Sequence, residues 1–259
     1  MSKSANHFVW YDLTTTDPDA AIAFYTEVIG WKTSDAHQGD YTMYGNSETT
    51  LGGFSQLPKE AAAHGVPPHW MVYVASDHLE TTISKATGLG ASVQVPPTVI
   101  PDAGRFAVLR DPQGATFALY ESTKAYELDP PKTQLGRFSW HEMYADDPET
   151  AFKFYSDLFG WAEAGRMPLP GLGDYVMFKG DFELHRGGFA AKPPPMAKAP
   201  SNWLFYITVA DLDATLDVVK RLGGDVWNGP MEVPGGDVVA MCHDPQGAAF
   251  ALHMTPANR

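Results

Sequence analysis

The sequence contains little cysteine and little positive charge. Cys242 is the one cysteine in 259 residues, which excludes an internal disulfide, and in the strand-like segment VVAMCH it is expected to be a buried, inert thiol. The chain has 18 Lys and Arg residues against 31 Asp and Glu residues, a net charge of −13. Such a surface repels phosphate backbones, so nucleic acid is excluded as an expected partner.

Long hydrophobic runs are also missing. Hydrophobic residues make up 44% of the chain, yet no apolar stretch approaches the roughly 18 residues that a membrane-spanning helix needs. The N-terminal segment MSKSANHFVWYD lacks the apolar core of an export signal. We therefore expect a cytoplasmic protein that has no membrane partner.

The sequence does contain a second copy of its own pattern. Residues 8–31, FVWYDLTTTDPDAAIAFYTEVIGW, return as residues 138–161, FSWHEMYADDPETAFKFYSDLFGW. A second motif, DPQGATFAL at 111–119, returns as DPQGAAFAL at 244–252. The spacings are 130 (140 minus 10) and 133 (244 minus 111), so the whole half-chain is repeated. This predicts an N-terminal domain at 6–125, a linker at 126–135 and a C-terminal domain at 136–256.

A finer pattern within each half predicts an α+β fold. After each first strand, Asp17 and Asp147 are expected to cap a helix that ends at Gly30 or Gly160. Further strands follow, and a second strand and helix begin near Trp70 and Trp203 with the same order. The DPQG tetrapeptide predicts a hairpin turn between the last two strands. Each half thus contains two βαβββ modules, with linkers expected at 57–68, 127–133 and 193–200.

These motifs resemble the vicinal oxygen chelate superfamily, which includes glyoxalase I, bleomycin-resistance proteins and extradiol dioxygenases. The similarity rests on DxxxAxxFYxxxxGW after a first strand and on DPxGxxxxL at the end of each half. More narrowly, two fused domains with W-x-[DE]-[LM] in the first strand resemble the Cfp30B-type glyoxalase-like proteins. The resemblance implies that each half builds a curled eight-stranded mixed sheet from its two modules, with helices flanking it.

The resemblance also implies a divalent metal in each concavity, held by His or Gln from a first strand and Glu from a last strand. Carried over to this sequence, those positions fall on side chains without a suitable oxygen or nitrogen donor. They are Trp10, Met71 and Ala118 in the first half and Trp140, Leu204 and Ala251 in the second, and the remaining position of each half lies within TTLGGF or HRGGF. A register shifted by one would introduce His141 but no set of three ligands. We therefore expect no metal or other cofactor at the usual positions.

Residues two beyond the lost ligand positions share their face of the strand and are our candidates for the site. In the second half, Glu142, Tyr206 and His253 are expected to form a general acid/base group. In the first half, Asp12, Tyr73 and Tyr120 are expected to form a binding set, with Asp12 as a further catalytic candidate. The last two candidates are Trp10 and Trp140, which stand at the first-strand ligand positions. Their indole rings could stack on a flat molecule.

Several alternatives remain open at this point. The acids could equally pair with backbone amides at a domain seam, and a solvated or structural role suits His253 near the C-terminus. The protein could bind a small flat organic molecule without catalysis. It could instead be an enzyme, either a lyase, isomerase or hydrolase that uses Glu142 with His253, or Asp12, or a glyoxalase-like lyase with a displaced metal. Since the duplication supplies internally the pairing that one-domain members obtain by dimerising, a monomer is expected.

Overall fold

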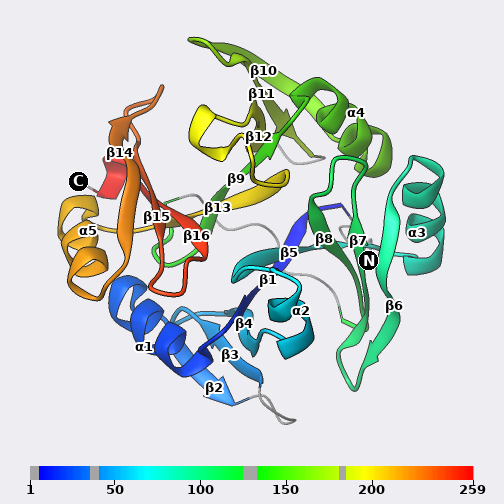
Figure 1. Ribbon diagram of the computed structural model, residues 1–259, viewed down its shortest axis with the longest axis horizontal. Helices are drawn as coiled ribbons and strands as arrows, with labels where there is room; N and C mark the ends of the chain where they lie inside the picture. Colours follow the sequence, from blue (N-terminus) through cyan, green and yellow to red (C-terminus); the bar gives the residue numbers. More distant parts are fainter. Residues whose placement is uncertain (1–5, 36–40, 125–132, 181–184, 259) are drawn as a thin grey trace. The chain divides into compact units, whose positions relative to one another are not determined.

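The computed structural model describes residues 6–35, 41–124, 133–180 and 185–258. The first half of the chain forms an eight-stranded mixed sheet, sheet A (Figure 1). Strand pairs β1–β4 and β5–β8 are parallel, whereas the outer pairs are antiparallel. In spatial order the strands are β2 (Lys32–Asp35), β3 (Tyr41–Gly45), β4 (Thr50–Gln56), β1 (Phe8–Thr15), β5 (His69–Ala75), β8 (Thr116–Ser122), β7 (Gly104–Arg110) and β6 (Ser92–Ile100).

The second half repeats this topology in sheet B, again with parallel pairs at the corresponding strands, β12–β9 and β13–β16. In spatial order the strands are β10 (Ala162–Leu169), β11 (Gly173–Lys179), β12 (His185–Ala191), β9 (Phe138–Ala145), β13 (Asn202–Thr208), β16 (Ala249–Met254), β15 (Val238–His243) and β14 (Asp225–Glu232). The expected α+β fold of two tandem repeats, each with an eight-stranded mixed sheet, is confirmed.

Local capping determines where the first helix of each half begins and ends. Helices α1 (Pro18–Ile29) and α4 (Pro148–Phe159) follow Asp17 and Asp147. The Asp17 side chain accepts a hydrogen bond from the backbone N–H of Ala20, and the Asp147 side chain accepts two such bonds. Both helices end at a left-handed glycine, at φ of 80° and 75°. The predicted caps are therefore confirmed.

The second helices are capped differently in the two halves. Helix α5 (Leu212–Arg221) starts at Asp211, whose side chain accepts from the Ala214 N–H. Helix α3 (Leu79–Gly88) starts at His78, which makes no side-chain cap. There the Glu121 carboxylate of β8 accepts from the Leu79 N–H at 2.7 Å. A side chain from the sheet thus replaces the local cap.

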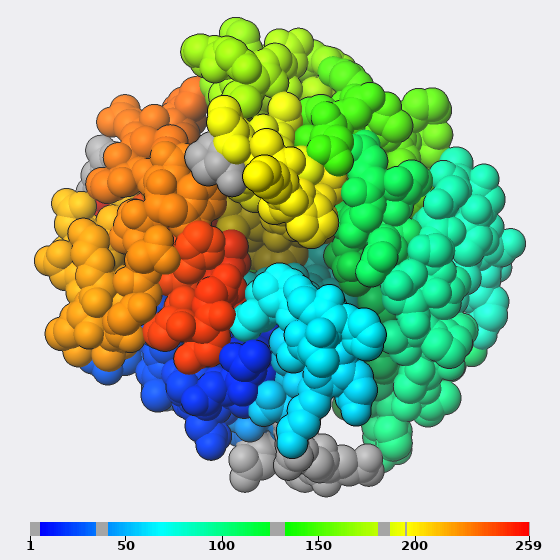
Figure 2. Space-filling model, in the orientation of Figure 1, coloured from blue at the N-terminus to red at the C-terminus, as the bar shows by residue number. Residues whose placement is uncertain are grey.

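Two of the predicted linkers contain short helical turns that the sequence analysis did not predict. Helix α2 (Lys59–Ala63) lies within the linker 57–68, and the 3₁₀ turn η1 (Pro194–Met196) lies within the linker 193–200. A second 3₁₀ turn, η2 (Pro256–Asn258), follows the last strand. Figure 2 shows the segment around α2 in cyan and that around η1 in yellow, both at the surface. Most of the third linker, 127–133, lies outside the described residues.

By internal contacts the chain forms two compact units, and each unit draws on both halves of the sequence. Unit 1 comprises Met1–Trp10, Val72–Leu128 and His141–Trp203. Unit 2 comprises Tyr11–Met71, Asp129–Trp140 and Leu204–Arg259. Helix α3 accordingly packs with α4 in unit 1, and α1 packs with α5 in unit 2. The domain boundaries 6–125 and 136–256 stay a prediction.

The aromatic residues of the repeated motifs form the core of each unit. In unit 1, the indole of Trp161 stacks on Phe178 with ring centroids 4.5 Å apart, and in unit 2 Trp31 stacks on Tyr44 at 4.2 Å. Burial of side chains this large is the main source of apolar stabilisation in a domain of this size. The tryptophan that ends each IGW or FGW motif is therefore a core residue.

A buried polar chain runs through each core and involves the DPQG aspartate. In unit 2, Trp70 Nε1 donates to Tyr25 Oη at 3.2 Å, and Tyr25 Oη donates to Asp244 Oδ2 at 3.1 Å. In unit 1, Trp203 Nε1 donates to Tyr155 Oη at 3.2 Å, and Tyr155 Oη donates to Asp111 Oδ2 at 3.0 Å. The second carboxylate oxygen of each aspartate accepts from two backbone N–H groups of its own turn. DPQG thus forms the predicted hairpin turn and also fastens it to a helix from the other half of the chain.

Candidate functional site

Asp12 lies buried on β1 within unit 2 and is held by a tyrosine. Asp12 is only 8% exposed to solvent. Tyr41 Oη, from β3, donates to Asp12 Oδ1 at 2.5 Å. A carboxylate in such a place is costly unless it accepts hydrogen bonds, and a short bond from a phenol offsets part of that cost. Asp12 is thus a preorganised acceptor whose environment is built from two strands.

The Gly52-Gly53 pair makes room for this arrangement. A Cβ on Gly53 would lie 2.0 Å from Cζ of Tyr41, and a Cβ on Gly52 would lie 1.7 Å from the Tyr11 carbonyl oxygen. The pairing of β4 with β1 is regular through both glycines, Tyr11 with Gly52 and Asp12 with Gly53. The glycines allow a close strand approach and a tyrosine ring against the sheet.

Glu142 occupies the equivalent position in unit 1. It is 7% exposed and pairs with Gly188 of β12. A Cβ on Gly188 would lie 2.2 Å from Cζ of Tyr175, so the Tyr175 ring lies directly over the residue beside Glu142. Each half therefore places an acid, a glycine and a tyrosine together on corresponding strands. Sequence reasoning missed Tyr41 and Tyr175, although both recur at the start of DYTMYG and DYVMFKG.

His253 is buried in unit 2, at 5% exposure, and both of its ring nitrogens have polar neighbours. Nδ1 lies 2.8 Å from Ser139 Oγ, and Nε2 lies 3.2 Å from Asp237 Oδ2. Ser139 Oγ also donates to the Tyr206 carbonyl oxygen at 3.2 Å. The structure thus rules out a solvated His253 and connects it to Tyr206 through Ser139. Ser139 and Asp237 gave no signal in the sequence, because neither residue type recurs at the matching position of the first half.

Tyr73 and Tyr120 lie together in unit 1. Tyr73 pairs with Ala118, two residues before Tyr120 on β8, and its ring centroid is 5.9 Å from that of Phe106. Tyr120 Oη donates to the Ala103 carbonyl oxygen at 3.0 Å, and burial raises the pKa of Tyr120 above its usual value. Its phenol is thus held as a neutral hydrogen-bonding group.

The predicted sets are divided between the two compact units. Unit 1 holds Trp10, Tyr73, Tyr120 and Glu142, and unit 2 holds Asp12, Trp140, Tyr206 and His253. The structure therefore brings Tyr206 and His253 together through Ser139, and Tyr73 and Tyr120 together on paired strands. Glu142 lies in unit 1, whereas Tyr206 and His253 of its predicted set lie in unit 2. Asp12 lies in unit 2, whereas Tyr73 and Tyr120 of its predicted set lie in unit 1. Trp10 and Trp140 are partly exposed, in contrast to the buried residues that follow them on β1 and β9.

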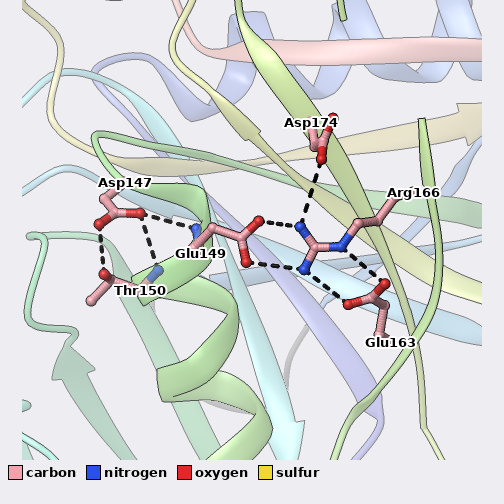
Figure 3. A network of polar contacts seen from close by, with 6 residues as sticks. All are labelled: Asp147, Glu149, Thr150, Glu163, Arg166 and Asp174. Carbon is pink, nitrogen blue, oxygen red and sulfur yellow. Dashed lines mark hydrogen bonds and ion pairs between the residues drawn. The ribbon is translucent and has the colours of Figure 1, made fainter. Parts of the chain in front are cut away.

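A separate charged cluster lies at the surface of unit 1 (Figure 3). The guanidinium group of Arg166 on β10 contacts both carboxylate oxygens of Glu149 and lies 2.9 Å from Glu163 Oε2 and 3.8 Å from Asp174 Oδ2. The hydrogen bonds from Arg166 lower the pKa of Glu163. The side chains are exposed, so this cluster links β10 and β11 to the start of α4 and contributes modestly to stability.

The residues at the ligand positions implied by the resemblance were tested for donors that suit a metal ion. Trp10, Trp140, Ala118 and Ala251 offer no carboxylate or imidazole donor. Across residues 6–35, 41–124, 133–180 and 185–258, no group of three or more His, Cys, Asp or Glu side chains is placed to hold a metal ion. In the same ranges, no helix has the length and apolar character needed to cross a bilayer.

Comparison with known proteins identifies the family. The model of the Glyoxalase/Bleomycin resistance protein/Dioxygenase superfamily matches residues 4–119 and again 137–252. The chain is 32% identical over 247 residues to "Putative glyoxylase CFP32" of Mycobacterium tuberculosis, covering 94% of this chain and 92% of that protein. It is 29% identical over 256 residues to the "Anthracycline biosynthesis protein DnrV" of Streptomyces peucetius, covering 94% and 91%.

Solved structures show the same fold. The Mn(II)-bound glyoxalase from Novosphingobium aromaticivorans superimposes with a TM-score of 0.69 at 14% identity, covering 96% of this chain and 82% of that one. A catechol 2,3-dioxygenase gives a TM-score of 0.66 at 14% identity, covering 99% and 96%. The two family-model matches together span most of the sequence, and the sheet topology agrees with them. The chain therefore belongs to the Glyoxalase/Bleomycin resistance protein/Dioxygenase superfamily.

Proposed function

We propose that this protein binds a small, flat organic molecule and does so without a divalent metal at the superfamily's usual positions. The observation that carries the proposal is the replacement of the first-strand ligand by a partly exposed indole in both halves, Trp10 and Trp140. An indole cannot ligate a hard cation, but its face stacks well on a planar ring. The same flat side chain stands at this position in both halves, which favours stacking over metal chemistry.

Fixed polar groups in each unit support this proposal. Asp12 is held by Tyr41, and the phenol of Tyr120 is held by a backbone carbonyl, so both present fixed hydrogen-bonding groups. Binding sites for flat ligands typically combine aromatic walls with a few fixed polar groups of this kind. The relative named for anthracycline biosynthesis supports a polycyclic aromatic ligand. In this proposal the protein acts as a cytoplasmic monomer, and light scattering during size-exclusion chromatography tests the monomer.

A second candidate function is catalysis by acid/base groups. It is favoured by the short bond from Tyr41 to Asp12 and by the polar contacts on both nitrogens of His253. In this alternative Asp12, Glu142 or His253, each within its own unit, moves a proton during a lyase, isomerase or hydrolase reaction. A glyoxalase-like lyase with a displaced metal, consistent with the name of the mycobacterial relative, would need ligands away from the usual positions.

Quenching of tryptophan fluorescence tests the binding proposal. Titration with a planar anthraquinone is expected to quench the wild-type protein at micromolar concentration, and Trp10→Leu or Trp140→Leu is expected to weaken binding about tenfold or more. Trp227→Leu is the control, because Trp227 has no counterpart in the first half. Equal affinity in all four proteins would contradict the proposal. For the catalytic alternative, turnover must collapse in Asp12→Asn or Glu142→Gln while binding and folding persist.

A further inference from the structure

The second half of the chain carries a serine, a histidine and a carboxylate in hydrogen-bonding sequence. Ser139 Oγ lies 2.8 Å from His253 Nδ1, and His253 Nε2 lies 3.2 Å from Asp237 Oδ2. A hydroxyl beside a base that is oriented by a third group is the arrangement that activates serine for attack on a carbonyl. We propose that Ser139, His253 and Asp237 form a nucleophilic site that hydrolyses activated carboxylic esters, thioesters or lactones. This activity goes beyond the ligand binding proposed above and does not depend on it.

The three residues are positioned by strands of unit 2. Ser139 lies near the start of β9 and His253 on β16, while Asp237 directly precedes β15. His253 pairs with Val239, two residues beyond Asp237, so strand pairing fixes the separation of imidazole and carboxylate. His253 and Asp237 are 5% and 7% exposed, which strengthens the interaction between them. Ser139 is partly exposed, so the attacking residue is the one that solvent reaches.

The ring orientation and the resting hydrogen bond of the serine define the first chemical step. Nδ1 faces the serine and Nε2 faces the carboxylate, the reverse of the serine-protease arrangement. Either imidazole nitrogen can accept a proton, so the reversed ring can serve as the base. At rest Ser139 Oγ donates to the Tyr206 carbonyl oxygen at 3.2 Å. For attack, the hydroxyl proton must turn from that carbonyl to the nearer His253 Nδ1.

The first half shows that the fold does not require this set. The matching positions are Val9 for Ser139 (139 minus 130), Tyr120 for His253 and Gly104 for Asp237 (253 and 237 minus 133). Tyr120 Oη donates to the Ala103 carbonyl oxygen in the loop before β7, and the same carbonyl accepts from the backbone N–H and the hydroxyl of Thr123. That loop is therefore held without a histidine–carboxylate pair. In the second half, His253 contacts Asp237 of the corresponding loop. It also contacts Ser139, and this second contact has no counterpart in the first half.

The reaction balances with water as the second reactant. Ser139 Oγ bonds to the acyl carbon while its proton passes to His253 Nδ1. The bond from the acyl carbon to the alcohol or thiol then breaks, and His253 returns the proton to that leaving group. Water next attacks the acyl-serine ester, gives a proton to His253, and releases the carboxylic acid with restoration of the Ser139 hydroxyl. The Asp237 carboxylate acts as a positioning residue throughout.

Covalent labelling of the intact wild-type protein is the primary test. Diisopropyl fluorophosphate is expected to phosphorylate Ser139 with loss of fluoride, and mass spectrometry of peptides locates the adduct. The exposed Ser84 on α3 is the internal comparison. Labelling of Ser139 at least tenfold faster than of Ser84 supports the site. An unlabelled Ser139, or equal rates, would overturn it, and this result requires no variant to fold.

Hydrolysis of p-nitrophenyl acetate provides the second test. Ser139→Ala and His253→Gln are each expected to lower kcat/KM by about 10²–10⁴-fold, and Ser84→Ala is expected to leave it unchanged. Asp237→Asn is expected to lower kcat with KM within about twofold, and Asp237→Glu to restore part of the rate. Folded variants with wild-type rates would overturn the nucleophilic site. Loss of thermal stability in Asp237→Asn without a fall in kcat would overturn the role given to Asp237. Anthraquinone binding is measured on the same proteins. Its loss would contradict the proposed ligand binding without bearing on the nucleophilic site.

Discussion

Tyr25 Oη donates a 3.1 Å hydrogen bond to Asp244 Oδ2 across 219 residues of sequence. The bond joins helix α1 of the first half to the last hairpin of the second half, within one compact unit. Tyr155 and Asp111 repeat it in the other unit at 3.0 Å. Because the duplicated halves exchange these contacts, each core depends on both copies of the repeat.

Removal of this phenol is expected to destabilise the fold. Tyr25→Phe keeps the buried ring but removes the hydroxyl bonded to Trp70 and Asp244, so we expect a loss of about 1–3 kcal/mol. Urea unfolding followed by circular dichroism measures the change. Tyr155→Phe is the matched variant and should show a similar loss. A change below about 0.5 kcal/mol in both variants would contradict the structural importance of the bond.

The stability of the fold is expected to depend on pH through Asp244. Burial raises the pKa of Asp244, although backbone hydrogen bonds and Tyr25 act in the opposite direction. A carboxyl with a raised folded-state pKa stabilises the fold fully below its unfolded pKa, and this contribution is lost as the pH rises through the folded-state pKa. Asp244→Asn should therefore cost more stability at pH 4 than at pH 7. Asp111, whose pKa is also raised by burial, should behave alike. A larger cost at pH 7 in both variants would contradict the sign.

Gly53 is expected to tolerate no side chain while Tyr41 is present. In Gly53→Ala the new methyl group would overlap the Tyr41 ring, and we expect a loss of about 2 kcal/mol or more. Gly88→Ala is the control, since Gly88 has nothing within 4 Å and lies in a helix, where alanine is favoured. Adding Tyr41→Ala to Gly53→Ala should recover part of the loss in a double-mutant cycle. Strict additivity would show that the ring is not the obstacle.

Cys242 is expected to be unreactive in the folded protein. Burial raises the pKa of its thiol to about 12, so the thiolate that reacts with disulfide reagents is scarce at neutral pH. Ellman's reagent at pH 8 should label the native protein very slowly and the urea-unfolded protein within minutes. Rapid stoichiometric labelling of the native chain would contradict the buried position of the thiol.

Short-range features of this protein could be predicted from sequence, whereas contacts between its halves could not. Asp17 and Gly30 act within a few residues of themselves, so their type and spacing predict the helix ends. Asp111 carries an equally local signal for its turn, but nothing local indicates that Tyr155 is its partner. Helix α2 was missed because five residues give too short a pattern to read.

The candidate site divides in the same way. Asp12 and Glu142 stood out because an acid in an apolar strand is unusual. Tyr41 contacts Asp12 because of how the strands pair. Ser139 and Asp237 contact His253 from separate parts of the sheet. Side chains that converge from distant strands carry no spacing that a single sequence reveals.

Calorimetric titration of chelator-treated protein with a planar anthraquinone tests the central claim most directly. The titration is run on protein whose metal content has been shown by elemental analysis to be negligible, and again after addition of Mn, Fe, Zn or Ni. The proposed function predicts binding at micromolar concentration that metal does not change and that Trp140→Leu weakens. Binding that appears only after metal is restored, with stoichiometric metal retained, would contradict it and would support a metal-dependent enzyme.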